Sequence, residues 1–136
     1  MDTHQLPRSS RFGCAVVLSI LAAGCGGGES ESARVERTIV DFSKAVGAHD
    51  TDKQCALLSR GYLRTLASRY KVSCPALIRN SQQQLAPTGV PVKKVAVAGQ
   101  HASAYMDASG TRTRFILVKE NTAWKIDTIQ TVDTTF

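Results

Sequence analysis

The sequence predicts an α+β domain in which helices come first and an antiparallel sheet follows. Apolar residues recur at helical spacing in the first half of the chain and alternate with polar residues in the second half. Ala86-Pro87-Thr88-Gly89 breaks the chain between the two patterns. Short links between the alternating segments favour antiparallel strands, so we expect helices to cover one face of the sheet and solvent to meet the other.

The first helix is predicted over Ala33–Ala48. Val35, Ile39, Phe42 and Val46 follow one another at spacings of four, three and four residues. This spacing places all four side chains on one helix face, while charged residues occupy the other faces. We therefore expect this apolar face to lie on the sheet.

A second helix is predicted over Asp52–Arg60, because Thr51 and Gln54 fit a capping box. Gly61 is expected to stop this helix, and Tyr62–Arg69 to add a further helical turn.

A third helix is predicted to begin at Ser73-Cys74-Pro75 and to run to about Leu85, because proline is tolerated in a first helical turn. The predicted strands are Val92–Ala98, His101–Ala108, Thr111–Glu120 and Thr122–Thr131. Alternation on the last strand places Trp124, Ile126 and Thr128 on one face, opposite Lys125 and Asp127.

The composition is that of a folded chain, with 43% hydrophobic and 21% charged residues and a net charge of +6. Four cysteines and three histidines argue against a zinc-finger or multi-metal protein, and their spacing suggests no metal site. Glycine-rich nucleotide loops, P-loops and Gly-X-Ser-X-Gly motifs are absent from the sequence. We therefore expect neither a metal nor a cofactor.

Residues 1–24 have the character of a signal peptide. Arg8 and Arg11 precede the uncharged run Phe12–Ala23, which is well short of the ~20 residues of a membrane span. The run ends in Leu21-Ala22-Ala23-Gly24-Cys25, which resembles the lipobox of bacterial lipoproteins, although that family more often has Leu where Ala22 stands. The alternative is an ordinary secretory signal with a free Cys25.

The lipobox resemblance implies that the chain is cut before Cys25 and that this cysteine carries a diacylglycerol and often a further acyl chain such as palmitate. Two or more acyl chains suffice for stable membrane attachment. Residues 25–32 are rich in Gly, Ser and Glu and are expected to form a flexible tether to a folded domain over residues 33–136. The predicted location is the extracytoplasmic face of the cell membrane.

Cys55 and Cys74 remain once Cys14 leaves with the leader and Cys25 is lipidated. Exported compartments are oxidising, so a leftover pair favours a structural disulfide. The alternative is a redox-active pair. It is less favoured, because catalytic pairs normally stand close together as Cys-X-X-Cys.

The segments over Val35–Val46, Ala48–Ser59, Ser73–Ile78 and Phe115–Ile129 resemble small exported lipoproteins of the nuclear-transport-factor-2-like superfamily. The resemblance implies a curved sheet wrapped by helices into a cone, often with an apolar pocket. The superfamily includes isomerases, dehydratases and polyketide cyclases as well as non-enzymatic binding domains, so the fold alone does not identify the chemistry.

The second predicted strand carries the main candidate for an active site. His101, Ser103, Tyr105 and Asp107 alternate along it and therefore share one face. On a concave face, His101 or Asp107 would act as general base and Tyr105 as hydrogen-bond donor. The favoured alternative is that this face is solvated and that the alanines and Met106 between these residues point inward.

No acidic residue occurs between Asp52 and Asp107. The basic residues of this interval are Lys53, Arg60, Arg64, Arg69, Lys71, Arg79, Lys93 and Lys94. One hypothesis is contact with anionic lipid headgroups or anionic wall polymers near the membrane. The favoured alternative is an ordinary solvated surface of mixed charge. Nucleic acid is a poor partner for an exported chain with 6% aromatic residues.

Together these observations predict a lipid-anchored, non-catalytic domain that binds a ligand or supports a cell-envelope assembly. A small apolar molecule inside the cone is the expected ligand. The alternative function is a small isomerase-, dehydratase- or cyclase-type enzyme that uses the polar face of the second strand. The oligomeric state stays open, a homodimer included.

Overall fold

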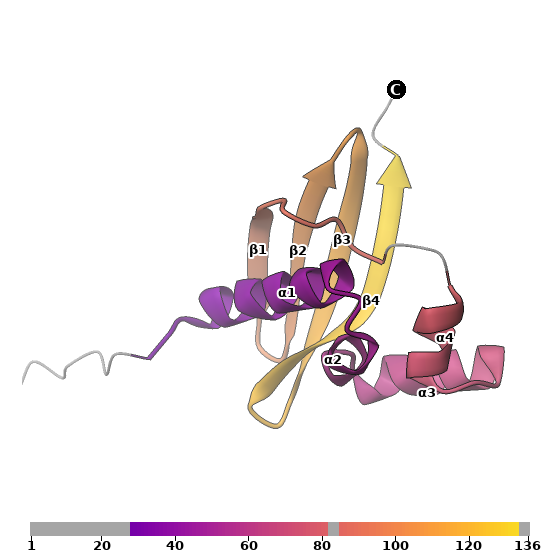
Figure 1. Ribbon diagram of the computed structural model, residues 1–136. Helices are drawn as coiled ribbons and strands as arrows, with labels where there is room; N and C mark the ends of the chain where they lie inside the picture. The colour runs from indigo at the N-terminus through magenta and orange to yellow at the C-terminus, as the bar shows by residue number, and fades with distance from the viewer. Residues whose placement is uncertain (1–27, 82–84, 134–136) are drawn as a thin grey trace, which may run out of the picture.

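The computed structural model describes residues 28–81 and 85–133, so the predicted signal peptide and Cys25 lie outside the described residues. Figure 1 shows helices and a sheet in separate layers. The helices are α1 (Glu31–Gly47), α2 (Thr51–Ala56), α3 (Arg60–Tyr70) and α4 (Cys74–Asn80), and the strands are β1 (Val92–Ala98), β2 (His101–Ala108), β3 (Thr111–Glu120) and β4 (Ala123–Asp133).

The strands form an open antiparallel sheet whose spatial order follows the chain, β1-β2-β3-β4. Helix α1 crosses one face of this sheet and contacts both β1 and β4, whereas α3 contacts β4 (Figure 1). The predicted α+β class, with helices packed against a four-stranded antiparallel sheet, is confirmed.

The core lies between α1 and the sheet. Val35, Ile39, Phe42 and Val46 are all buried, as their spacing predicts. They pack against inward side chains of every strand, among them Met106 on β2. Burying a large apolar side chain contributes about 1.5–3 kcal/mol, so this interface is the main source of stability.

The first turns of α1 and α2 differ from the predictions. Glu31 and Ser32, assigned to the tether by the sequence, already belong to α1. The N-cap of α2 is Asp50 rather than Thr51, because the Asp50 carboxylate accepts a hydrogen bond from the Lys53 backbone N–H at 3.0 Å. The predicted capping box is therefore wrong.

The junction between α2 and α3 also corrects the sequence prediction. Helix α2 ends at Ala56 because the next residues pair with β4 as a short parallel bridge. The Ser59 N–H donates to the Ile126 carbonyl at 2.8 Å, and the Ile126 N–H donates to the Leu57 carbonyl at 2.9 Å. Gly61 does not stop a helix and instead lies in the first turn of α3.

The third predicted helix is shorter than expected. Helix α4 ends at Asn80 rather than near Leu85, and Ser81 is its extended C-cap. None of its residues is buried. The predicted disulfide is confirmed: a Cys55–Cys74 bond of 2.04 Å ties α4 to α2.

A β-bulge on β4 corrects the predicted faces of that strand. Leu117 pairs with Ile126, but the preceding Ile116 pairs with Thr128, so Asp127 is an extra residue without a partner on β3. A bulge reverses the alternation of side chains beyond it. The prediction that Ile126 and Thr128 share a face is therefore wrong.

Candidate functional site

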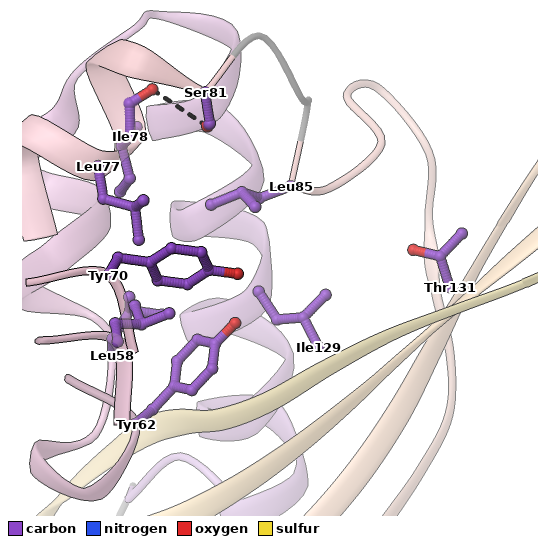
Figure 2. Close-up of a pocket in the computed structure, with 10 residues that line it drawn as sticks. Leu58, Tyr62, Tyr70, Leu77, Ile78, Ser81, Leu85, Ile129 and Thr131 are labelled. Atoms are coloured by element: carbon purple, nitrogen blue, oxygen red, sulfur yellow. Dashed lines mark hydrogen bonds between the residues drawn. The ribbon is translucent and has the colours of Figure 1, made fainter. Parts of the chain in front are cut away.

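A cavity of about 650 Å³ lies between α3, α4 and the second half of β4 (Figure 2). This volume falls within the ~300–1,000 Å³ that is usual for small-molecule sites. Leu58, before α3, lines the cavity, as do Ser81 and Leu85, which follow α4. The walls are mainly apolar, and hydroxyl groups are the polar functions among the lining side chains.

Helix α3 forms one wall with Tyr62, Leu66 and Tyr70. Residues four apart lie on the same side of a helix, so these side chains form a continuous stripe. The spacing is visible in the sequence. The stripe was missed because only one further helical turn was expected over Tyr62–Arg69, whereas α3 is a helix of 11 residues that extends to Tyr70.

Helix α4 forms the facing wall with Leu77 and Ile78. Because α4 buries none of its residues, its position depends on its contacts with α2 and α3 and on the Cys55–Cys74 bond. The disulfide therefore supports the cavity as well as the fold.

The bulge on β4 completes the site. Beyond Asp127, Ile129 and Thr131 turn to the face covered by the helices, and both line the cavity. The Ser59 hydroxyl donates to the Asp127 carboxylate and accepts from the Tyr62 backbone N–H at 2.9 Å. One serine thus caps α3 and joins its first turn to the bulge that orients the opposite wall.

Two of the hydroxyl groups that line the cavity belong to tyrosines of α3. Figure 2 shows the Tyr62 and Tyr70 hydroxyls on the same side of α3, directed toward the space beside Ile129. Burial raises the pKa of Tyr62, and neighbouring Tyr70 raises it further. Both effects oppose the phenolate, so the Tyr62 hydroxyl is a neutral hydrogen-bond donor.

The strand-two candidates lie on the other face of the sheet. His101 is exposed, and Tyr105 and Asp107 are half-buried. The side chains of Ala102, Ala104 and Met106 between them are buried in the core. None of these three candidates is among the residues that line the cavity described above.

Asp107 is instead part of a charged surface cluster. Its carboxylate accepts a hydrogen bond from the Arg112 side chain at 2.8 Å, which lowers the pKa of Asp107 and raises that of Arg112. The Tyr105 ring lies between Arg112 and Arg114, whose guanidinium carbons are 5.5 and 5.9 Å from the ring centroid. A carboxylate stabilised in this way is a weaker base than a free one.

The basic residues predicted as a surface are exposed but fall into separate groups. Arg60, Arg64, Arg69, Lys71 and Arg79 lie on or beside α3 and α4, whereas Lys93 and Lys94 lie on β1 at the other edge of the sheet. In the first group, Arg60 is paired with Glu120 at 3.3 Å. These residues therefore form two surfaces rather than one.

Across residues 28–81 and 85–133, no group of three or more His, Cys, Asp or Glu side chains is placed to hold a metal ion. Over the same residues, no helix combines the length and apolarity needed to cross a membrane. Comparisons of the chain with protein-family models, curated proteins and solved structures find no match.

Proposed function

We propose that this chain is a lipid-anchored extracytoplasmic lipoprotein whose domain binds a small apolar molecule without chemical conversion. The observation that carries the proposal is the cavity of about 650 Å³ between α3, α4 and β4. Its apolar walls supply affinity through burial, at roughly 25 cal/mol per Å² of apolar surface removed from water. Its hydroxyl groups form hydrogen bonds that orient the bound molecule.

The lining of the cavity favours binding over catalysis. General acid–base chemistry needs a side chain that exchanges a proton near the working pH, most often His, Glu or Asp. The described lining residues offer Tyr, Ser and Thr hydroxyls in place of these groups. The raised pKa of Tyr62 moves its hydroxyl further from such a role.

The proposed location rests on the leader and on its lipobox-like end at Cys25. Helix α1 begins at Glu31, so residues 26–30 connect the acylated cysteine to the fold. At ~3.3–3.6 Å per residue, this connection extends less than about 20 Å. The domain is thus held close to the bilayer, where its basic helices α3 and α4 would meet anionic lipid headgroups or wall polymers.

Membership of the nuclear-transport-factor-2-like superfamily, with its cone-shaped sheet, is part of the same proposal. The order of helices before strands and the position of α1 across the sheet support it. The cavity between the sheet and the helices is the feature that this resemblance leads one to expect.

Binding is tested with the full chain carrying Cys25→Ser, which removes the acyl acceptor, and with N-phenyl-1-naphthylamine, a neutral apolar fluorophore. We expect saturable enhancement of its fluorescence. Leu77→Asp places a charge in the cavity wall and should abolish the enhancement. Val132→Asp makes the same change at an exposed position and should preserve it. No enhancement in the parent chain, or equal enhancement in both variants, would contradict the proposal.

Anchoring is tested in a bacterial host by membrane fractionation and by labelling with an alkyne analogue of palmitate. The Cys25→Ser chain should lose the label and leave the membrane fraction or remain uncut. Cys14→Ser changes the other cysteine of the N-terminal region and should behave as the parent. A Cys25→Ser chain that is still labelled, cut and membrane-bound would exclude the anchor.

A further inference from the structure

Helix α3 contributes two of the four hydroxyl groups that line the cavity, and the other two belong to Ser81 after α4 and Thr131 on β4. The Tyr62 and Tyr70 hydroxyls both come from α3 and point to the same side (Figure 2). The walls contributed by α4 are aliphatic. A ligand that fills this space therefore meets two phenol donors along α3 and the aliphatic side chains of Leu77 and Ile78 along α4.

Arg69 places a positive charge beside these donors. It follows Tyr62 by seven residues and Leu66 by three, which puts it on the same side of α3 as the cavity stripe. Its guanidinium carbon lies 5.7 Å from the centroid of the Tyr70 ring. Arg69 is exposed, and within residues 28–81 and 85–133 it forms no ion pair with a carboxylate.

No negative charge of the helical walls offsets Arg69, because neither α3 nor α4 contains an acidic residue. The Asp127 carboxylate on β4 already accepts a hydrogen bond from the Ser59 hydroxyl. The Tyr70 ring, which lines the cavity, thus also contacts the Arg69 guanidinium, and the Tyr62 and Tyr70 hydroxyls supply neutral donors on the same helix.

We propose that the ligand is an amphiphile with an alkyl body and a single carboxylate head, the chemistry of a long-chain fatty acid. The alkyl chain lies between α4 and Ile129, and the carboxylate lies at the Tyr70 end of α3. There it accepts hydrogen bonds from the tyrosine hydroxyls and faces the Arg69 guanidinium. The guanidinium carries the charge opposite to that of a carboxylate, and the phenol hydroxyls donate hydrogen bonds to the carboxylate oxygens.

This inference rests on the proposed apolar binding and adds to it the nature of the head group. The effect of Arg69 is expected to be modest, because its guanidinium is exposed and its ion pair is screened by water. We expect about a three- to fivefold loss of carboxylate affinity on removing its charge. Loss of a phenol donor to the carboxylate is expected to cost about tenfold.

The experiment measures displacement of N-phenyl-1-naphthylamine from the full Cys25→Ser chain by dodecanoate, dodecan-1-ol and dodecyl phosphate. Dodecanoate should compete best. Arg69→Gln should reduce the preference for dodecanoate over dodecanol, and Tyr62→Phe should reduce it further. Arg64→Gln is the matched control, because Arg64 stands two residues from both Tyr62 and Leu66 and so projects to the other side of α3.

Equal competition by dodecanoate and dodecanol would overturn the carboxylate proposal, as would equal effects of Arg69→Gln and Arg64→Gln. Stronger competition by dodecyl phosphate would overturn it in favour of a phosphate head. In each of these cases the neutral probe still binds, so apolar binding by the cavity stands. Absence of probe binding to the parent chain would overturn both proposals together.

Discussion

Removing the Cys55–Cys74 disulfide tests the link between stability and the cavity. The bond joins residues 19 positions apart and connects α2 to α4. In the chain-entropy account, closing a loop of this length restricts the unfolded chain and stabilises the fold by about 3 kcal/mol. For a domain of this size, each kcal/mol changes the melting temperature by roughly 4–8 °C, so the double Cys→Ser variant should melt about 12–24 °C lower.

The structure adds a local effect to this global one. Helix α4 has no fully buried residue, so the disulfide is an important part of what holds it against α2 and α3. Its Leu77 and Ile78 form one wall of the cavity. The Cys55→Ser/Cys74→Ser variant should therefore bind N-phenyl-1-naphthylamine more weakly even at temperatures where circular dichroism shows it to be folded.

Urea denaturation and thermal melting with and without dithiothreitol measure both effects. Reductant should destabilise the parent chain by about as much as the double substitution does, and should leave the double variant unchanged. Two results would refute the reasoning. One is a double variant within about 0.5 kcal/mol of the parent, which is the range of neutral surface substitutions. The other is an equal response of both chains to reductant.

Three further predictions concern the core, the bulge and the N-terminal turn of α1. Phe42→Ala empties a fully buried position and should lower the free energy of unfolding by about 3–5 kcal/mol in urea titrations, and a loss under 1 kcal/mol would contradict the core assignment. Ser59→Ala removes both the α3 cap and the hydrogen bond to Asp127, and should cost about 1–3 kcal/mol in the same titration while weakening probe binding. Hydrogen bonds from Lys119 and Trp124, at 3.0 and 2.6 Å, lower the pKa of Glu31, so their stabilising effect is complete above pH 4.5 and is lost as pH falls through the lower pKa of the folded state. Acid titration followed by fluorescence of this single tryptophan should show the parent losing more stability than Glu31→Gln, and identical acid sensitivity of the two chains would contradict the assignment.

Local patterns predicted the parts of the fold that local forces determine. The bounds of β1, β2 and β3 match their predictions. The signals that predict them, alternation of apolar and polar residues and the turn residues between strands, both depend only on residues close together in the sequence. The apolar face of α1 was likewise predicted correctly from the spacing of its residues. The disulfide was predicted from the two cysteines that would remain if Cys14 left with the predicted leader and Cys25 were lipidated.

The errors arose where distant segments decide the local structure. From the sequence, Gly61 was expected to end a helix. In the structure, the bridge between Leu58 and Ile126 ends α2 earlier, and α3 begins at Arg60 as a separate helix. The bulge at Asp127 could not be predicted from the alternation of residues along β4 either, because it depends on how β4 pairs with β3. Since both features shape the cavity walls, the sequence predicted an apolar pocket only through a family resemblance and did not locate its tyrosines.

The two edges of the open sheet have a consequence for copies of the chain that would share a membrane under the proposed anchoring. An unpaired strand edge invites another strand to add to it, and attachment to a surface would bring such edges into frequent contact. On β1, Pro91 precedes the strand, and a register shift with Lys94 at positive φ interrupts the ladder. On β4, the backbone of Leu57 and Ser59 already occupies the edge at Ile126. Neither side offers an unbroken ladder, so the geometry opposes the growth of strand-paired polymers among crowded neighbours.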